Sequence, residues 1–232
     1  MLRLDNLDDT TRKTLHIAAV LGMSFSMKEI LEISGHILSI SEENKKEHAV
    51  VVRSSLKQAV AEGILDEDIY DSQDDWSLSN GSDMSEMIVD IGDSTGARPR
   101  KHLTVQYTYT FYHDTWRRVI KSLMLDSWVR DIHMHAATAI EARVPDNEMR
   151  DYGTKVKLFQ HWKGSENTIR AAEVALDIGK SFKLLGMNLH SIKLYEDAID
   201  MWQRHDPTEG EDRIGGKSIL RISRIIFLHS KH

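Results

Sequence analysis

Residues 215–218, Gly-Gly-Lys-Ser, are the part of this sequence that comes closest to a phosphate-binding motif. A Gly-Lys-Ser sequence holds phosphates with backbone amides and a lysine when it joins a strand to a helix. The spacing fails here, because the first glycine of the motif belongs at position 211, which is Glu211, and Gly210 lies one residue too early. The preceding residues also have a helical pattern. We interpret the segment as a Gly-rich turn before a last helix and expect no nucleotide cofactor.

The sequence contains histidines that are candidate metal ligands. Of the 12 histidines, His133 and His135, with His113, are the nearest to a ligand set. Residues two apart on a helix point to different faces, whereas helical metal-binding pairs are spaced i, i+3 or i, i+4. No carboxylate or third ligand has a matching position. Surface or hydrogen-bonded histidines are the favoured interpretation, and a metal site is the weaker alternative.

The remaining polar residues do not form a recognisable catalytic or calcium-binding pattern. Asp66-x-Asp68 and Asp74-Asp75 could bind calcium, but neither follows the ligand order of an EF-hand. The chain has no nucleophile elbow, and it has no cysteine, which excludes disulfides, thiolate zinc sites and cysteine nucleophiles. The sequence therefore predicts a chain that is not itself an enzyme.

Charge and composition give no indication of a nucleic-acid or membrane partner. The 232 residues are 41% hydrophobic and carry 30 Lys and Arg against 36 Asp and Glu, a net charge of -6. This balance gives no general attraction to nucleic acid or an anionic membrane. No apolar run approaches the ~20 residues of a membrane span, and no signal-peptide core begins the chain. We expect a soluble, cytoplasmic protein.

The N-terminal part is predicted to hold three helices. The first runs from an N-cap at Asp8 or Asp9 to Gly22. Ser26-x-x-Glu29 fits a capping box at the start of the second, with Phe25 and Ile30 at hydrophobic-staple positions. The third covers residues 47–62, is ended by Gly63, and has an apolar face. The residues expected on that face are Val52, Leu56, Ala59 and Val60.

Two strands are predicted to follow these helices, one on each side of an acidic segment. A short strand begins at Ile64-Leu65, and residues 103–111 alternate between apolar or aromatic and polar side chains. Between Asp66 and Ala97 the sequence has ten acidic residues and no Lys or Arg, so residues 71–100 are interpreted as a solvated or disordered insertion. Helices followed by a β-hairpin have the order of a winged helix, with the hairpin as its wing.

The rest of the chain is predicted to be helical. One helix begins at Asp114 and a second covers residues 126–143, with Pro145 marking its end. From Asp151 onward short helical hairpins are expected. The apolar positions expected to face a core are Trp116, Ile120, Leu123 and Met124 in the first helix; Val129, Ile132, Ala136, Ala139 and Ile140 in the second; and Tyr152, Val156, Phe159, Ile169, Ala172, Leu176, Gly179, Leu189, Ile192, Tyr195, Ile199 and Trp202 beyond them.

Three segments, residues 7–34, 56–67 and 109–143, resemble in order and spacing the region that follows the ATPase module in signal-transduction ATPases with numerous domains. The resemblance extends over most of residues 7–202. It implies a mainly α fold in which residues 1–112 form a winged helix, residues 113–147 are connecting helices, and residues 148–232 are a truncated region similar to tetratricopeptide repeats. Members of this family are transcription regulators or proteins with class III nucleotide cyclase or kinase domains.

The spacing of Gly179, Phe182, Ser191, Tyr195 and Ala198 independently fits one degenerate tetratricopeptide repeat. Small residues in such a repeat let two antiparallel helices approach, and aromatic residues fill the gap between them. Residues 214–228 are expected to begin a further helix whose partner lies beyond the chain, so the sequence is taken to be a piece of a longer protein.

The resemblance implies a noncatalytic regulatory segment that couples an ATPase module to helical repeats. His113, Arg117 and Arg118 are its candidate contacts with the adjacent ATPase domain; surface solvation and pairing with Asp114 or Asp126 is the alternative for the arginines. Further helical repeats and other proteins are the remaining expected partners.

Direct DNA binding by the winged helix is the second functional hypothesis. The third helix offers only Arg53, Lys57 and Gln58 to a major groove, and the acidic wing would oppose phosphate contacts. DNA is therefore the less favoured partner.

Overall fold

The structure, a computed structural model, describes residues 7–72, 104–144 and 150–204. The chain divides into two compact units, Met1–Ala136 and Ala137–His232. The division falls inside residues 113–147, which the sequence predicts to be connecting helices. Most of the predicted acidic insertion, together with the Gly-Gly-Lys-Ser segment and residues 214–228, lies outside the described residues.

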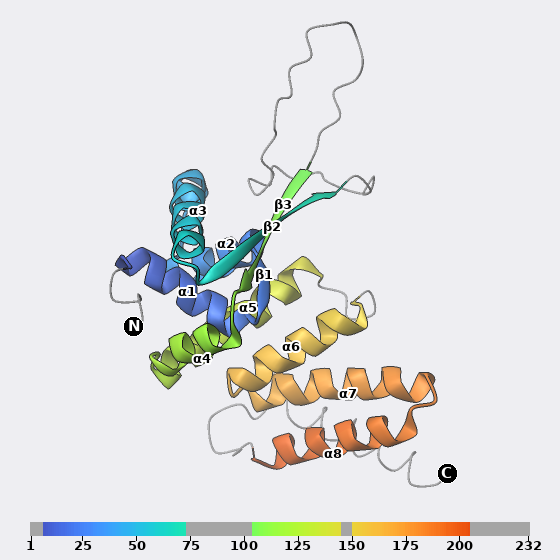
Figure 1. Ribbon diagram of the computed structural model, residues 1–232. Coiled ribbons are helices and arrows are strands. Elements are labelled where there is room, and N and C mark those ends of the chain that lie inside the picture. Colours follow the sequence, from blue (N-terminus) through green and yellow to red (C-terminus); the bar gives the residue numbers. More distant parts are fainter. Residues whose placement is uncertain (1–6, 73–103, 145–149, 205–232) are drawn as a thin grey trace, which may run out of the picture. The chain divides into compact units, whose positions relative to one another are not determined.

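The described residues are mainly helical, as the sequence predicts, and they include a small antiparallel sheet (Figure 1). None of the helices among them is both long and apolar enough to cross a membrane. The helices are α1 (Asp9–Leu21), α2 (Met27–Leu38), the 3₁₀ helix η2 (Glu42–Asn44), α3 (Lys45–Ala61), α4 (Asp114–Ser122), α5 (Asp126–Arg143), α6 (Tyr152–Gly164), α7 (Thr168–Leu184) and α8 (Asn188–Arg204). The strands are β1 (Ser24–Ser26), β2 (Leu65–Ser72) and β3 (Thr104–Phe111).

The starts predicted for α1 and α2 are confirmed, whereas α3 begins at Lys45, two residues before the predicted start. The Asp8 side chain accepts a hydrogen bond from the backbone N–H of Thr11, which caps α1. At α2, the Ser26 hydroxyl accepts from the N–H of Glu29 at 3.2 Å, and the Glu29 carboxylate accepts from the N–H of Ser26 at 2.8 Å. Both halves of the capping box are therefore present. Helix α3 ends with Gly63 at φ 68°, a left-handed conformation that glycine adopts without strain.

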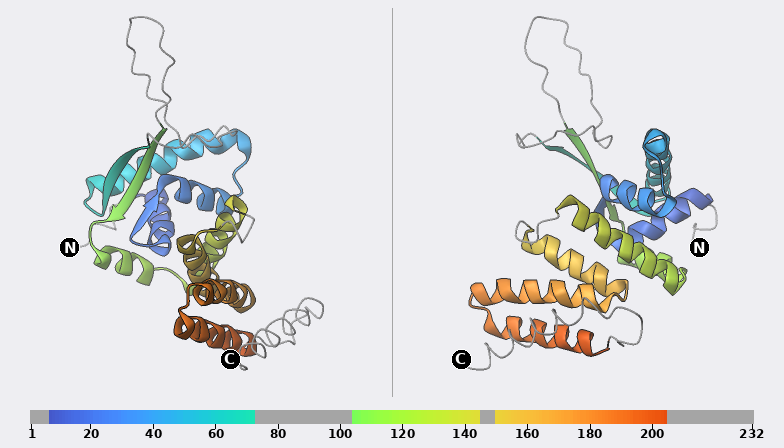
Figure 2. Two further views of the ribbon diagram at one scale, coloured as in Figure 1. Left: turned by 90° about the vertical axis from the view of Figure 1, so that its right-hand side faces the viewer. Right: turned by 180° about the vertical axis from the view of Figure 1, so that it is seen from behind.

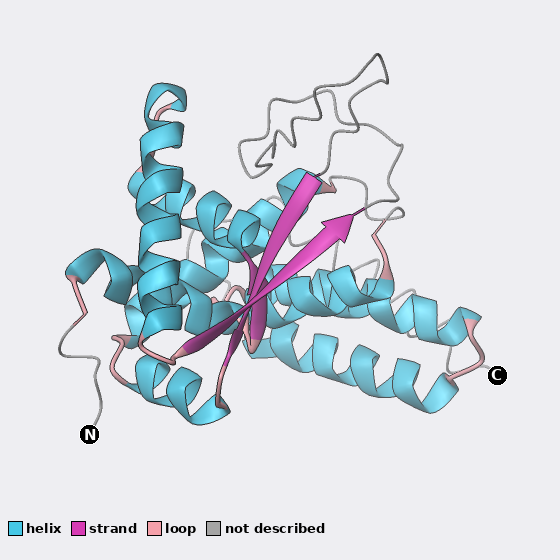
Figure 3. Cartoon of the chain, turned by 45° about the horizontal axis from the view of Figure 1, so that its top comes forward, coloured by secondary structure: helices cyan, strands magenta, loops and turns pink. Residues whose placement is uncertain are grey.

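The sheet has the order β1-β3-β2 and is antiparallel throughout (Figure 3). The predicted hairpin partners pair in register from Leu65 opposite Phe111 to Ser72 opposite Thr104. Strand β2 thus extends two residues into the segment predicted to be an insertion, because those residues find backbone partners on β3. Strand β1, which pairs Phe25 with Tyr109, is not among the elements predicted from the sequence.

Aromatic side chains from the sheet form the centre of the N-terminal unit. Tyr109 and Phe111 are buried on β3, and the Phe25 ring lies 6.0 Å and 5.9 Å from theirs, centroid to centroid. Helices contribute the buried residues Leu15, Ile30 and Leu56. The alternation along β3 therefore places its aromatic residues toward the helices, which ties the hairpin to them.

Helix α4 ends earlier than its apolar pattern suggests. The sequence predicts Leu123 on a core-facing stripe with Ile120, but the helix ends at Ser122. Ile120 is buried, whereas 68% of Leu123 is exposed. The prediction for Leu123 is wrong because the helical spacing that would place it beside Ile120 stops one residue before it.

The C-terminal unit contains the last part of α5 and helices α6, α7 and α8. Helices α7 and α8 lie side by side in every view of this unit (Figures 1 and 2). One apolar cluster joins α5, α6 and α7, and a second joins α7 and α8. The buried members of the two clusters are Ala137, Leu158, Trp162, Ala171, Val174 and Ile178 in the first, and Ala172, Ala175, Leu176, Tyr195 and Ala198 in the second.

The apolar stripes predicted for α6 and α8 are buried only in part. Helix α6 buries Leu158, His161 and Trp162, while Tyr152 is more than half exposed. On α8, Leu189 and Ile192 are exposed. The other members of the predicted stripes lie in or pack against the apolar clusters, so each stripe is buried only where a neighbouring helix covers it. These members are Val156 and Phe159 on α6, and Tyr195, Ile199 and Trp202 on α8.

Candidate interaction surfaces

The start of α4 carries the residues predicted to contact an ATPase domain. His113 occupies the N-cap position, is exposed, and meets the Tyr112 ring edge-on at 4.6 Å. Arg117 donates from Nε to Asp114 Oδ1 at 2.9 Å, and Arg118 donates to the other carboxylate oxygen. These two hydrogen bonds lower the pKa of Asp114.

The pairing with Asp114 is the alternative that the sequence left open for these arginines. An arginine has five N–H donors, so a bond to Asp114 leaves donors for a second acceptor. The Arg118 side chain is 74% exposed and that of Arg117 is 27% exposed. Asp114 therefore holds two guanidinium groups together at the surface, where they could bind an acidic partner.

The residues predicted to read DNA bases are largely engaged within the N-terminal unit. Arg53 donates from Nη2 to the Tyr107 hydroxyl at 2.8 Å, and its guanidinium carbon lies 4.6 Å from the centroid of the same ring. Gln58 accepts a hydrogen bond from the Thr11 hydroxyl at 2.8 Å. Lys57 alone of the three is exposed. The exposed face of α3 therefore has fewer side chains available for contacts in a DNA major groove than its sequence suggests.

The hydroxyl of Tyr109 on β3 forms a hydrogen bond with an acidic residue on the neighbouring strand β2. It donates to Glu67 Oε1 on β2 at 2.7 Å. Burial, followed by this hydrogen bond, raises the pKa of Tyr109 well above its usual value. Tyr109 therefore remains a neutral hydrogen-bond donor, and its bond to Glu67 links the side chains of β3 and β2.

The five residues predicted from the tetratricopeptide spacing fall on α7 and α8. The decisive pair is Gly179 and Tyr195: a Cβ atom at Gly179 would lie 2.5 Å from Cε1 of the tyrosine ring. Ser191 and Ala198 are buried on α8, and the Phe182 ring contacts those of Tyr152 and His190. The hairpin closes because a glycine faces an aromatic ring.

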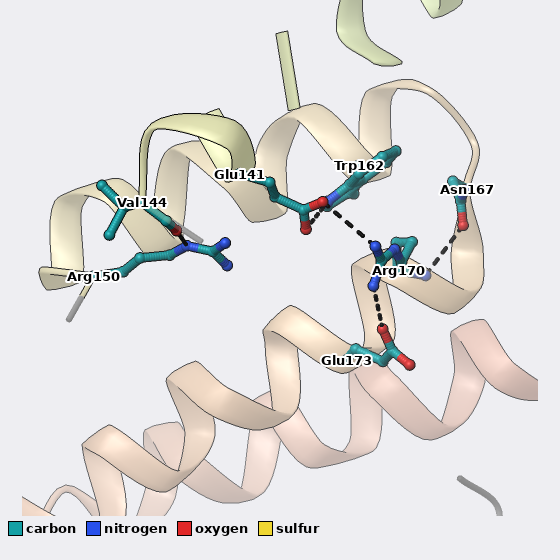
Figure 4. Close-up of polar contacts among 7 residues, drawn as sticks. All are labelled: Glu141, Val144, Arg150, Trp162, Asn167, Arg170 and Glu173. Atoms are coloured by element: carbon teal, nitrogen blue, oxygen red, sulfur yellow. Dashed lines mark hydrogen bonds and ion pairs between the residues drawn. The ribbon is translucent and has the colours of Figure 1, made fainter. Parts of the chain in front are cut away.

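A polar cluster links α5, α6 and α7 in the C-terminal unit (Figure 4). Glu141 accepts hydrogen bonds from Trp162 Nε1 at 3.2 Å and from Arg170 Nη2 at 3.4 Å. Arg170 also pairs with Glu173 at 3.2 Å, and its guanidinium carbon lies 5.8 Å from the Trp162 ring centroid. The cluster orients α7 against the end of α5.

Sequence reasoning missed this cluster. Its main contacts join residues 21 and 29 positions apart, which exceeds any helical spacing. Two other polar contacts at these helix ends join residues that are close in sequence. Asn167 caps α7 by accepting from the N–H of Arg170 at 3.1 Å, and Arg150 donates to the carbonyl of Val144 at 2.7 Å. Of these contacts, only the Asn167 cap could have been predicted from the sequence, because an N-cap joins residues three positions apart.

The histidines considered as metal ligands have other surroundings. Within residues 7–72, 104–144 and 150–204, no three His, Cys, Asp or Glu side chains come together in a way that could hold a metal ion. His133 is buried, and the His135 ring stacks on that of His36 at 6.4 Å between centroids. Burial, and then the neighbouring His36, lowers the pKa of His135.

Comparisons with known proteins add no relative: no protein-family model, no curated protein and no solved structure matches this chain. Function must therefore be argued from the residues and their geometry.

Proposed function

We propose that this chain is a noncatalytic regulatory and protein-interaction segment of a larger, cytoplasmic ATP-dependent signalling protein. The observation that carries the proposal is the α7–α8 hairpin, whose two helices are brought together at Gly179 and Tyr195. Stacked helical hairpins of this kind present extended surfaces to other polypeptides. In this proposal, the hairpin supplies a binding surface for other polypeptides.

In the same proposal, the N-terminal unit is a winged helix. Three helices precede the β2–β3 hairpin, and β1 pairs with β3 so that the hairpin is attached to the helical part. The hairpin leads into the acidic segment on both sides. A wing with this charge suits contact with basic protein surfaces better than contact with phosphates.

In the proposed arrangement, the start of α4 contacts the ATPase module. Asp114 holds Arg117 and Arg118 side by side, which gives a compact cationic group for acidic residues of that module. His113 would lie at the same contact. The nucleotide state of the ATPase would then change how the winged helix docks on it. The helical repeats would bind a partner or restrain the rest of the protein.

The test begins with the coding sequence on either side of this chain, which must contain a Walker-type ATPase module. Binding of that module to this chain should weaken with salt and should weaken further for the Arg117→Glu/Arg118→Glu variant. Arg12→Glu/Lys13→Glu is the matched control, because it reverses two exposed charges on α1. The absence of an ATPase module, or equal loss of binding in both variants, would refute the proposal.

Direct DNA binding is the alternative function. Arg53 and Gln58 already bond within the N-terminal unit, which leaves Lys57 as the exposed candidate on this part of α3. Binding to random duplex DNA at low salt decides between the two functions. Tight, steeply salt-dependent binding that Lys57→Glu weakens would favour DNA binding; no measurable affinity would favour protein interaction.

An enzymatic function would require a nucleotide or metal site in this chain. Titration of the full chain with ATP and magnesium addresses the Gly-Gly-Lys-Ser segment directly. Saturable ATP binding that is lost in Lys217→Ala would overturn the noncatalytic proposal.

A further inference from the structure

The turn between α7 and α8 (Figure 1) carries the densest run of exposed apolar side chains among the described residues. Within residues 184–192, five large apolar side chains are at least 40% exposed. They are Leu184 at 90%, Leu185 at 72%, Met187 at 40%, Leu189 at 81% and Ile192 at 51%, and together they form the turn patch. Elsewhere in the described part of the chain, such side chains occur along the sequence singly or in pairs. Exposed apolar surface gathered in this way marks a contact site.

The backbone of the turn is ordered. The backbone N–H of Met187 donates to Phe182 O at 2.9 Å and that of Gly186 donates to Lys183 O at 3.0 Å, with Gly186 at φ 74°. This is the hydrogen-bond pattern of a Schellman motif, which ends α7 with a defined geometry. Because the backbone is already fixed, covering the patch costs little additional chain entropy.

The exposed side of α8 changes character along its length. Its core side packs toward α7 through Tyr195 and Ala198. The opposite side begins with Leu189 and Ile192 next to the turn and continues with charged residues at helical spacing. These exposed residues are, in order, Lys193, Glu196, Asp197 and Asp200. The exposed side is therefore apolar next to the turn and acidic from Glu196 onward.

We propose that two copies of this chain associate through their turn patches, with their α8 helices antiparallel about a twofold axis at the level of residues 190–191. Residues at equal distances from such an axis face each other, so Leu189 of each copy packs on Ile192 of the other. A twofold contact uses the same patch twice, which is the commonest arrangement of soluble homo-oligomers. The second copy therefore covers apolar surface with apolar surface.

Charge selects the antiparallel direction. In a parallel pair, Glu196, Asp197 and Asp200 would each lie beside the same residue of the second copy, and like charges placed together cost affinity. In the antiparallel pair, the two acidic halves point away from each other. Each acidic half then passes the turn of the other copy, where Lys183 is exposed in the last turn of α7. The lysine has three N–H donors and can reach a carboxylate of the second copy from the rim of the contact.

The size of the patch sets the strength of the contact. A leucine-sized side chain removes roughly 100 Å² of apolar surface from water when it is fully buried. The partly exposed side chains of the patch therefore offer on the order of 300 Å² per copy, against the ~800 Å² per partner of a standard interface. We expect a weak dimer, with a Kd on the order of tens of micromolar.

Self-association through the turn is independent of the proposed ATPase contact, which uses residues of α4. A chain that stays monomeric would leave the proposed function standing. A missing ATPase module would leave the dimer standing.

Sedimentation equilibrium of the full chain, from about 1 to 300 μM, measures the association. Leu189→Glu/Ile192→Glu places charge in the centre of the patch. Leu123→Glu/Leu125→Glu is the matched control, because these leucines are 68% and 77% exposed at the turn between α4 and α5. Hydrogen exchange in α7 and α8 checks that each variant remains folded. We expect a monomer–dimer equilibrium whose Kd the first variant raises at least about tenfold, a difference of ~1.4 kcal/mol, and the control changes by less than about twofold.

Cross-linking with a short bis-maleimide tests the direction, since the chain has no cysteine of its own. Antiparallel pairing separates the two copies of residue 193 by about 8 Å along the helices and the two copies of residue 200 by about 28 Å. Lys193→Cys should therefore form the interchain product at least about tenfold faster than Asp200→Cys. A chain that stays monomeric at every concentration, whose patch must then have another occupant, would overturn the inference. So would equal weakening by the two glutamate variants, growth beyond a dimer, or equal cross-linking rates.

Discussion

Replacement of Gly179 by alanine tests whether close approach of α7 and α8 holds the C-terminal unit together. In an open helical site, glycine to alanine stabilises a protein by about 1 kcal/mol, because alanine loses less backbone entropy on folding. At Gly179 the new Cβ would lie 2.5 Å from Cε1 and 2.9 Å from Cδ1 of Tyr195. Favourable carbon–carbon contacts lie at about 3.5–4.0 Å.

The clash determines the sign of the effect. Overpacking a buried site typically costs about 1–3 kcal/mol. The Tyr195 ring is buried and cannot turn away freely. After subtraction of the helix-propensity gain, we expect Gly179→Ala to destabilise the α7–α8 hairpin by up to about 2 kcal/mol.

Gly35 supplies the matched control. It lies inside α2, and no neighbouring heavy atom falls within 4 Å of a Cβ built there. We expect Gly35→Ala to stabilise α2 by up to ~1 kcal/mol, opposite in sign to Gly179→Ala.

Amide hydrogen exchange of the full-length variants provides the measurement, because it reports on α2 and on α7–α8 separately. Tyr195→Leu, which removes the ring, should abolish most of the cost of Gly179→Ala in a double-mutant cycle. If Gly179→Ala slows exchange in α7 and α8 as Gly35→Ala does in α2, the close-approach argument is wrong.

Three further predictions concern polar contacts. Tyr109→Phe removes the hydrogen bond to Glu67 and should destabilise the N-terminal unit by about 1–3 kcal/mol, measured by hydrogen exchange of β2 and β3. Glu141→Leu removes the acceptor of Trp162 Nε1 and should cost a similar amount in α6, whereas Glu141→Gln, which keeps an amide oxygen, should cost less. Because the pKa of His135 is lowered in the folded state, the unfolded chain binds its proton more readily, so stability is lost as pH falls below about 6.5. Thermal unfolding between about pH 7 and 5 should show this loss, and His135→Gln should reduce it; an unchanged pH dependence would contradict the assignment.

The parts of the fold that depend on neighbours in the sequence were predictable. Asp8 and Ser26 cap their helices through residues three positions away, and Gly63 ends α3 in the conformation that its type allows. The β2–β3 pairing followed from alternation along β3. Each of these features is set by backbone geometry and by side chains within one turn or one strand.

The candidate surfaces were predictable only in part. The i, i+3 and i, i+4 spacing of Asp114 with Arg117 and Arg118 made their pairing a stated alternative, and the structure forms both bonds. Strand β1 was missed because its three residues carry little pattern of their own, and its partner strand lies more than 80 residues away. The bond between Arg53 and Tyr107 spans 54 positions and could not be read from spacing.

The sequence by itself determined the capped starts of α1 and α2, the glycine after α3 and the strand alternation of the hairpin, since capping, turns and alternation act over a few residues. Tertiary structure decided which members of the apolar stripes of α6 and α8 are buried, and which distant polar groups Glu141 brings together. The physical reason is that burial and long-range hydrogen bonding depend on the surface of the opposing helix, which no local pattern contains.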